Sequence, residues 1–339
     1  MVVGETSRAL NWSLYDYDRD TNPELSKIEG VTSFCHVLTE SNTTHKSVPM
    51  LLSPVSAQNF DSIYYRKSVI TAFKEAGFQT AFFSNQRYNH SFIDFFGMEA
   101  DTYDFIKEDS QDSQYNPSDD ELLMLVEKEL EKGNRKQFIV LHTYGSHFNY
   151  RERYPETAAF FLPDFPVDAE VKYKDNLMNA YDNSIRYTDN FLARIIHLLK
   201  QQQVDASMLY TSDHGEDIFD DGRHLFLHAS PVPSYYQLHV PLLLWTSDSY
   251  REEYPGIEKA ASMNRQKNIS SSISFFQTMM ELAGIETPYR NDSLSVTSPL
   301  YTEKSRVYLN DHNEPRPLDD IGMRKEDFEM LKKRGIDAQ

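Results

Sequence analysis

Residues 209–217, with the sequence LYTSDHGED, constrain the fold of this chain more than any other segment. A short apolar run ends there abruptly in Asp213 and His214, which are followed by Gly215 and Glu216. An apolar run that crosses a sheet and ends in metal-type ligands is typical of α/β enzymes, which present their chemistry at the carboxyl ends of strands. Aspartate and neutral imidazole both bind zinc, and a glycine allows a sharp turn just after them. The segment therefore predicts an α/β fold with a metal site at this turn.

Short strand-like runs alternate with helical periodicity along the rest of the chain, and polar residues gather where the strands end. This alternation predicts a mostly parallel sheet with helices on both faces. We find no internal repeat and no low-complexity linker, so residues 1–339 are predicted to form a single domain. The expected strands are residues 1–4, 31–37, 80–83, 138–141, 208–210, 240–245 and 306–309, and the expected helices are residues 45–52, 69–76, 118–132, 170–202 and 271–284.

Several local patterns refine this prediction. Pro49 is compatible with a short helix if it lies in the first turn, where its missing N–H costs little. Ser118 followed by Glu121 is a capping-box pattern that should open a helix.

Residues 150–168 are rich in proline and aromatic residues and are expected to form an excursion or a lid. The charged tail after Asn313 is expected to be peripheral.

The charge balance excludes one large class of partner. The chain has 52 acidic and 34 basic residues, a formal net charge of −18 and no basic stripe, so we do not expect it to bind nucleic acid. Cys35 is the only cysteine, which rules out an intramolecular disulfide and a thiolate zinc cluster. Hydrophobic residues make up 40% of the chain, so a substantial core is expected.

The first residues indicate that a longer protein continues upstream. No apolar run approaches the roughly 18 residues of a membrane span, so the chain as given is expected to be soluble. Residues 1–3 form only the stub of a strand, however, and the ligand-like Glu5 follows at once. We therefore expect this sequence to be the soluble portion of a longer protein, cut just upstream of its first strand.

Four side chains carry the predicted chemistry, namely Glu5, Thr44, Asp213 and His214. Each follows a predicted strand or lies in a turn, and in a parallel sheet such ends converge on one side. Two carboxylates and one imidazole make a zinc set with one position left for a reacting oxygen. A threonine hydroxyl is a poor nucleophile near neutral pH, but coordination to zinc lowers its pKa. The sequence therefore predicts a zinc enzyme that moves a phosphoryl-linked group through Thr44.

Four passages, spread in order over about two thirds of the chain, resemble the catalytic domain of lipid-modifying phosphoethanolamine transferases of the alkaline phosphatase and sulfatase superfamily. They are GETSR at residues 4–8, with NWS at 11–13 and RDTNP at 19–23; TTHKSVP at 43–49; LHTYGSH at 141–147, followed by RYP at 153–155; and SDHGE at 212–216, with His228 downstream. The pairing of GETSR with SDHGE is the most specific part of this resemblance.

The resemblance implies an αβα sandwich and a ping-pong reaction. Thr44 would attack the phosphorus of phosphatidylethanolamine and release diacylglycerol. The phosphoethanolamine-threonine intermediate would then be passed to an acceptor, typically a phosphate or a sugar of lipid A or its core. The resemblance also implies a location at the bacterial inner membrane, with this domain in the periplasm.

The resemblance also assigns roles to individual residues. The positions that match its zinc ligands are Glu5, Thr44, Asp213 and His214, so Zn²⁺ is the expected cofactor. The positions that match or lie near contacts to the substrate phosphate or to a further metal are His142, His147 and His228, which leaves room for a second zinc ion. Gln86 and His90 are the candidate equivalents of an Asn and a Lys that the family tends to place after the preceding strand.

The chain also departs from the family pattern. The family often has a glycine and flanking cysteines around its nucleophile turn, where this chain has Glu40, Ser41 and Met50, so a stapling disulfide is absent. Glu216 has two readings: it either orients the zinc ligands or is a solvated surface charge.

Other enzymes of the same superfamily are the alternatives. A sulfatase of the usual kind needs a Cys or Ser in a C/S-x-P-x-R motif, and Cys35 is followed instead by HVLT. A simple phosphodiesterase remains open, and a glycerol-phosphate transferase of the lipoteichoic acid type also uses a threonine. The SVP turn and the opening GETSR favour the ethanolamine branch. The presence of all four ligand types argues against a catalytically inactive binding domain.

Overall fold

The computed structural model describes residues 1–107, 116–133 and 136–338. Its centre is a seven-stranded sheet in the order β2, β10, β7, β1, β6, β4, β5, in which only β10 runs antiparallel to its neighbours. The bounds are β1 Val2–Gly4, β2 Val31–Phe34, β4 Gln79–Ser84, β5 Thr102–Phe105, β6 Gln137–His142, β7 Ser207–Ser212 and β10 Leu242–Thr246. The prediction of a mostly parallel α/β fold is therefore confirmed.

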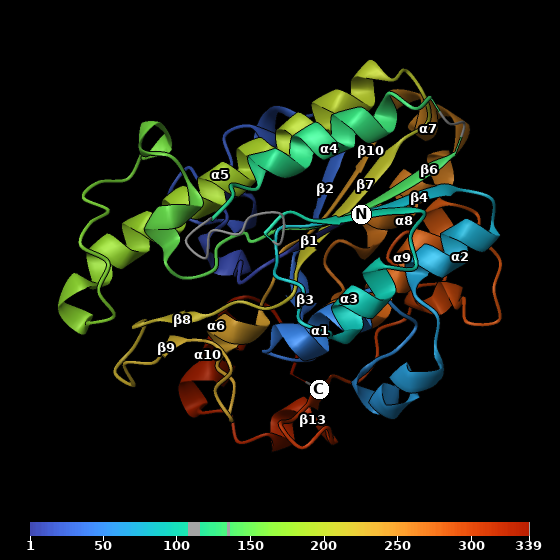
Figure 1. Ribbon diagram of the computed structural model, residues 1–339. Coiled ribbons are helices and arrows are strands. Elements are labelled where there is room, and N and C mark those ends of the chain that lie inside the picture. The colour runs from blue at the N-terminus through green and yellow to red at the C-terminus, as the bar shows by residue number, and fades with distance from the viewer. Residues whose placement is uncertain (108–115, 134–135, 339) are drawn as a thin grey trace.

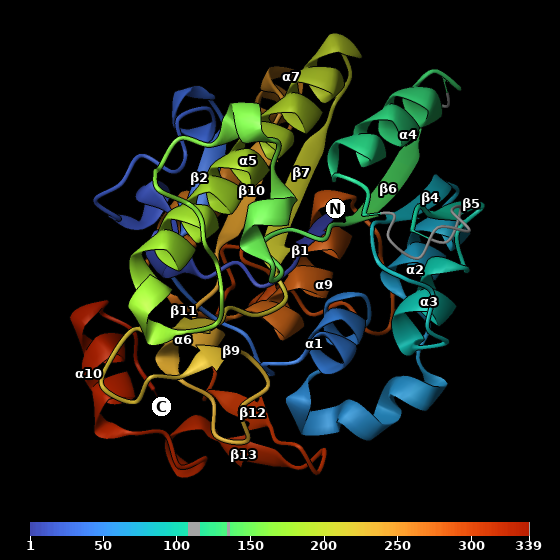
Figure 2. The ribbon, with the colours of Figure 1, turned by 60° about the vertical axis from the view of Figure 1, so that its left-hand side comes forward.

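Helices cover both faces of the sheet (Figures 1 and 2). One face carries α1 Thr44–Leu51, α2 Val69–Glu75, α3 Phe92–Gly97 and α9 Ser271–Leu282, and the other carries α4 Asp120–Leu130 and α5 Lys174–Gln201. Successive strand residues enter opposite layers, as Val2 packs with the α4–α5 side and Val3 with the α1–α9 side. Strands buried on both faces must be apolar at every position, which explains the short continuous apolar runs in the sequence.

The central strands deliver polar residues to one edge of the sheet. β1 lies between β6 and β7, with Val3 in register with His142 and Gly4 in register with Ser212. Ser84 at the end of β4 is also in register with His142. The residues that follow β1, β4, β6 and β7 therefore leave the sheet side by side, where chemistry is expected in a parallel sheet.

Two local predictions were wrong. The run at residues 31–37 is two strands, because the chain breaks at Cys35 and β3 His36–Leu38 pairs with β11 Asn268–Ser270 outside the central sheet. Pro49 lies in the middle of α1 and not in its first turn. The helix begins at Thr44, one residue earlier than expected, and ends only two residues after the proline.

The C-terminal part of the chain packs more closely than expected. β12 Val307–Leu309 pairs with β13 Pro315–Pro317 and is not an edge of the central sheet. α10 Lys325–Lys333 packs with α6 Tyr235–Leu238 and β12 in a separate hydrophobic cluster, in which Leu331 is buried. The prediction of a peripheral tail is therefore wrong for α10, whose apolar side chains pack in this separate cluster, whereas residues 314–317 are exposed.

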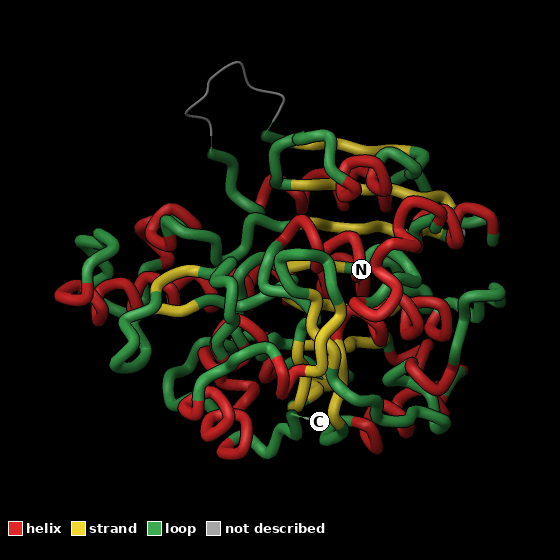
Figure 3. The backbone as a smooth tube through the Cα atoms, turned by 90° about the horizontal axis from the view of Figure 1, so that it is seen from below, coloured by secondary structure: helices red, strands yellow, loops and turns green. Residues whose placement is uncertain are grey.

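The remaining elements surround the sheet edge. β8 Asp217–Ile218 and β9 Phe226–Leu227 form a two-stranded pair that lies apart from the central strands, at the left of Figure 3. α7 Asp248–Glu253 and α8 Pro255–Asn264 follow β10. Residues 150–168 form an irregular excursion that lies along α5, where the amide of Asn183 holds its backbone. Among the described residues, no helix has both the length and the apolar character needed to cross a membrane.

Candidate active site

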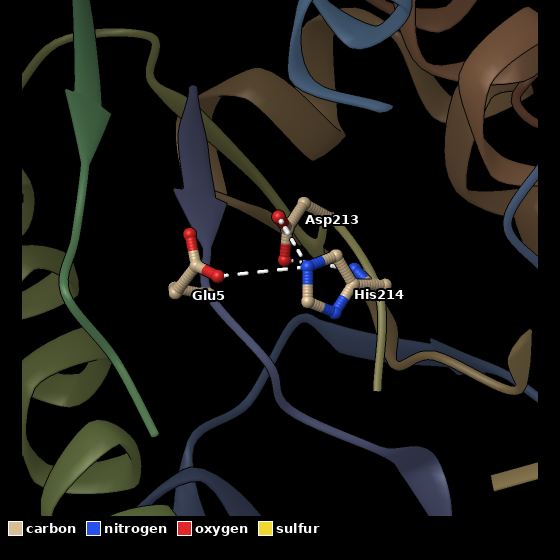
Figure 4. Close-up of side chains that lie close together, drawn as sticks. All are labelled: Glu5, Asp213 and His214. Carbon is tan, nitrogen blue, oxygen red and sulfur yellow. Dashed lines mark hydrogen bonds and ion pairs between the residues drawn. The ribbon is translucent and has the colours of Figure 1, made fainter. Parts of the chain in front are cut away.

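The structure brings the four predicted zinc positions together at this edge of the sheet. Glu5, Asp213 and His214 each offer one ligand atom, and these atoms lie within 4.8 Å of one another (Figure 4). His214 Nε2 is 3.2 Å from Asp213 Oδ2 and 3.6 Å from Glu5 Oε1. Thr44 Oγ1 lies 3.1 Å from both Glu5 Oε1 and His214 Nε2. Residues separated by more than 200 positions in the sequence thus share one small site.

Local backbone geometry holds these ligands. The Asp213 N–H donates to the Gly4 carbonyl, and the Thr6 N–H donates to Asp213 Oδ1, so the ends of β1 and β7 are tied together. Thr6 has a φ of +51°, which turns the chain sharply just after Glu5. Thr44 is the first residue of α1, where the helix dipole favours negative charge.

Two glycines permit the close approach of neighbouring loops. Gly145 has a φ of +50°, and a Cβ there would lie 2.7 Å from the carbonyl oxygen of Glu5. A Cβ on Gly215 would lie 2.2 Å from the carbonyl oxygen of Tyr236. Gly215 is therefore required by packing and not, as the sequence suggested, by an unusual turn, since its φ is not positive.

The electrostatics of the site fit a divalent cation. Burial raises the pKa of Asp213 to about 7, and burial together with the charge of Asp213 raises the pKa of Glu5. Burial also lowers the pKa of His214, which favours the neutral imidazole that binds metals. Asp213 Oδ2 is buried without a hydrogen-bond partner. Two buried carboxylates with an unused oxygen and a neutral imidazole are a donor set that suits zinc.

The predicted substrate histidines adjoin this site in a row. The rings of His214 and His228 lie 4.2 Å apart between centroids, and those of His228 and His147 lie 6.1 Å apart. Glu216 is fully buried and its Oε2 lies 3.2 Å from His228 Nδ1. Glu216 is therefore not a solvated charge, and it orients His228, the neighbour of a predicted zinc ligand.

The other three candidate residues lie in different surroundings. His142 is buried at the end of β6, and burial lowers its pKa to about 3, so it is neutral. Gln86 Nε2 donates to Glu5 Oε2 over 3.3 Å and to the Thr143 carbonyl over 3.0 Å, which places it at the site. His90 is exposed, contacts the ring of Tyr88, and does not line the neighbouring cavity.

A cavity of about 220 Å³ opens beside Thr44. Its lining includes Thr44, Gln86, His142 and His147, and also two residues that the sequence analysis did not select, Lys107 and Tyr144. Tyr144 could have been selected, because it lies within the segment LHTYGSH between two candidate histidines. Lys107 had no such signal, because it follows β5, a strand that was not predicted.

Asp119 is a third residue that the sequence analysis missed. Its Oδ1 accepts from the Tyr144 N–H and from Asn85 Nδ2, and its Oδ2 accepts from the Gly145 N–H. The predicted capping box is not formed by Ser118 and Glu121: α4 begins at Asp120, and its N-cap residue makes no side-chain cap. The carboxylate of Asp119 instead fixes the loop that follows β6.

Comparisons with known proteins identify the family of this chain. A family model described as Sulfatase matches residues 1–285. Phosphoethanolamine transferase EptA of Escherichia coli (strain K12) is 30% identical over 297 residues, which cover 85% of this chain and 53% of the relative. This chain thus spans about half the length of the curated relatives it matches.

Two solved structures are similar over most of their length. The C-terminal periplasmic domain of EcEptC from Escherichia coli, in complex with Zn, matches with a TM-score of 0.84 and 24% identity, covering 95% of this chain and 92% of that one. The C-terminal periplasmic domain of phosphoethanolamine transferase EptC from Campylobacter jejuni matches with a TM-score of 0.77 and 27% identity, covering 89% and 94%.

Proposed function

Because the chain belongs to the sulfatase family, we propose that it transfers phosphoethanolamine from phosphatidylethanolamine to a lipid A or lipopolysaccharide-type acceptor through Thr44. The observation that carries this proposal is the position of the Thr44 hydroxyl, 3.1 Å from both Glu5 Oε1 and His214 Nε2. A hydroxyl that contacts a carboxylate and an imidazole has the surroundings of an activated nucleophile. The names of the relatives supply the transferred group.

We propose that Glu5, Asp213 and His214 hold zinc together with Thr44. The bound ion would supply Lewis-acid chemistry, lowering the pKa of a hydroxyl and stabilising charge on phosphoryl oxygens. Asp213 Oδ2, which accepts no hydrogen bond and lies 3.2 Å from His214 Nε2, and the raised pKa of both carboxylates support this assignment. One ion accounts for this set, and metal analysis would show whether the adjoining histidines bind another.

The proposed reaction has two half-reactions. In the first, Thr44 Oγ1 forms a bond to the phosphorus of the donor while the bond from phosphorus to the glyceryl oxygen breaks, which releases diacylglycerol. In the second, an acceptor oxygen forms a bond to the same phosphorus while the Thr44 Oγ1–phosphorus bond breaks. The proton that the Thr44 hydroxyl loses ends on the glyceryl oxygen of the released diacylglycerol. Glu5 Oε1 and His214 Nε2, each 3.1 Å from Thr44 Oγ1, are within reach of that proton.

The surrounding polar side chains would bind the phosphoryl oxygens during both steps. His142 and His147 line the cavity beside Thr44, and His228 adjoins His214 and is oriented by Glu216. Gln86 holds Glu5 and lines the same cavity. Fixed donors of this kind stabilise charge as it develops on a transferring phosphoryl group. His90 is left out of this proposal because its side chain lies outside the cavity.

We also propose that residues 1–339 form one catalytic domain that works in the periplasm, held at the bacterial inner membrane by an additional N-terminal segment. The similar solved domains are described as C-terminal and periplasmic, which supports this location. The matched residues cover only about half the length of these relatives, which supports the additional segment.

The test is to incubate the zinc-loaded protein with vesicles of phosphatidylethanolamine. We expect release of diacylglycerol and a phosphoethanolamine adduct on Thr44, both measured by mass spectrometry. Thr44→Ala should form no adduct, whereas Thr44→Ser keeps a hydroxyl and should retain part of the activity. An adduct on the Thr44→Ala protein would show that the nucleophile lies elsewhere.

The same assay separates the alternatives. A phosphodiesterase would release diacylglycerol repeatedly without an acceptor. A glycerol-phosphate transferase would form its adduct from vesicles of phosphatidylglycerol and not from phosphatidylethanolamine. Either result would replace the proposed activity while leaving the role of Thr44 intact.

A further inference from the structure

Two basic side chains contact Tyr144, which lines the cavity beside Thr44: Lys107 lines the cavity as well, and Arg153 lies behind the ring, paired with Glu152. Lys107 Nζ lies 2.9 Å from the centroid of the Tyr144 ring, and Arg153 Cζ lies 4.3 Å from it. We call Lys107, Tyr144 and Arg153 the basic wall. The chain has a net charge of −18, so its composition does not lead one to expect two buried basic side chains against one ring.

The basic wall is held rigidly. The N–H of Ile106 donates to the carbonyl of Ser84, so the residue before Lys107 is fixed to the end of β4. The N–H of Tyr144 donates to Asp119 Oδ1 over 2.8 Å. Both sides of the contact between Lys107 and Tyr144 are thus anchored to the strand ends that build the site.

Lys107 faces the cavity, and no side chain of the described residues forms a salt bridge with it. It is 8% exposed, and burial, followed by the charge of Arg153, lowers its pKa to about 7. Within residues 1–107, 116–133 and 136–338, no carboxylate pairs directly with Lys107, and Asp119 and Glu5 act on it only through space. A buried ammonium without an ionic partner is costly, and an arriving anion removes that cost.

A row of rings links the basic wall to the zinc-type ligands. The row runs from His214 through His228 and His147 to Tyr144, and successive ring centroids are 4.2, 6.1 and 4.8 Å apart. Lys107 Nζ lies over the Tyr144 ring at the end of the row. The cavity is lined by Thr44 and by Lys107. A substrate that fills the cavity therefore reaches the proposed nucleophile and the basic wall together.

We infer that the basic wall is an anion subsite that binds a phosphate monoester on the acceptor. This inference rests on the proposed function. Phosphatidylethanolamine has a single phosphate, which must lie at Thr44 for the first half-reaction, so a second phosphate at Lys107 belongs to the acceptor. Lys107 is then a specificity-determining residue for the second half-reaction.

In the transfer to the acceptor, every bond, electron pair and proton is accounted for by the acceptor and Thr44. With its phosphate held by Lys107, an acceptor oxygen forms the new bond to the phosphorus carried by Thr44. The Thr44 Oγ1–phosphorus bond breaks, and Thr44 Oγ1 takes the electron pair and the proton that the acceptor oxygen loses. Neither an oxidant nor any further reactant is needed.

The experiment measures the two half-reactions separately. The donor step is the formation of the Thr44 adduct from phosphatidylethanolamine vesicles without an acceptor. The acceptor step is the loss of adduct from the isolated, modified protein after mixing with glucosamine 1-phosphate or with glucosamine. We expect Lys107→Met to slow transfer to the phosphorylated sugar about 10- to 100-fold more than it slows the donor step, because a charge-assisted hydrogen bond is lost.

Two control variants sharpen this test. Lys107→Arg keeps the positive charge and should restore transfer to glucosamine 1-phosphate. Lys136→Met removes another lysine that lies over an aromatic ring, Phe78 at 5.4 Å, outside the site, and should change neither step. Equal slowing of both steps by Lys107→Met, or equal slowing with glucosamine and its phosphate, would overturn the inference.

Failure of the proposed function would be recognised separately. If the wild-type protein forms no adduct, the transfer proposal fails, and binding of inorganic phosphate to the Thr44→Ala protein by calorimetry decides whether the subsite exists. Weaker phosphate binding after Lys107→Met would support the subsite. Unchanged binding would overturn it.

Discussion

The two ends of the ring row, His214 and Tyr144, adjoin buried side chains of opposite charge. At one end, which we call the metal-type centre, Glu5, Asp213 and His214 bury two carboxylates whose pKa values are raised. At the other end, the basic wall buries a lysine whose pKa is lowered to about 7. Among the described residues no salt bridge joins Lys107 to Glu5 or Asp213, and the charge of Glu5 acts on Lys107 only through space. Each end therefore favours its own external counter-ion, a cation at one and an anion at the other.

The largest effect should come from removing a carboxylate at the metal-type centre. Glu5→Gln should weaken zinc binding about a thousandfold, because one of the three charged or imidazole ligands is lost. Competition with a chromogenic chelator would measure this affinity. Glu75→Gln, at a carboxylate that is 62% exposed, should leave it unchanged. Unchanged zinc affinity in Glu5→Gln would show that the ion binds elsewhere. The metal-type centre would then not be the site of the external cation.

The metal-type centre was predictable from the sequence because its ligands are of a recognisable type and directly follow strands. Asp213 and His214 adjoin an apolar run, and Glu5 follows a stub of strand that could be read as β1. Thr44 alone carried the weakest signal of the four, since threonines in turns mostly bond their own backbone. The parallel sheet followed from the alternation of apolar runs with helical periodicity.

The basic wall could not be predicted in the same way. β5 has Tyr103 half exposed on its outer side and Asp104 within it, so the strand lacks the continuous apolar run of its neighbours. Without that strand, Lys107 had no predicted place. The role of Asp119 was hidden for a different reason: the nearby Ser118 and Glu121 matched a capping pattern, whereas the carboxylate bonds a loop 25 residues away. Long-range contacts of this kind leave no periodic trace in a single sequence.

A second prediction concerns the loop that joins the two ends. Gly145 follows Tyr144 and presses against the backbone of Glu5, where a Cβ would be 2.7 Å from a carbonyl oxygen. Gly145→Ala should lower the free energy of unfolding by about 2–4 kcal/mol, through backbone strain and the clash together. Urea denaturation of the protein would measure this loss.

The matched control is Gly77→Ala. Gly77 also has a positive φ, +84°, but nothing lies within 4 Å of a Cβ there, so only the strain of about 1 kcal/mol applies. Equal losses in the two variants would show that the loop can move away from Glu5. The metal-type centre and the basic wall would then not be held in a fixed relation.

A third prediction tests whether burial alone explains the raised pKa values at the metal-type centre. Asp189 on α5 is a buried carboxylate outside the site that accepts from the backbone N–H groups of Glu24 and Leu25. Burial raises its pKa from 3.8 to about 7. The folded protein therefore keeps the proton more tightly than the unfolded chain. The resulting stability is fully present below about pH 4 and is lost as the pH rises through about 7.

Over that range the free energy of unfolding should fall by about 1.4 kcal/mol per pH unit from this group. Asp189→Asn keeps an acceptor but cannot ionise, so the difference in stability between pH 5 and pH 8 should shrink in the variant, as measured by urea denaturation at each pH. Zinc should not alter this difference, because Asp189 lies outside the site. If the variant keeps the full pH dependence, burial does not raise the pKa of Asp189. Burial would then be a weaker explanation for the raised pKa values of Glu5 and Asp213, and their mutual repulsion would have to account for more of it.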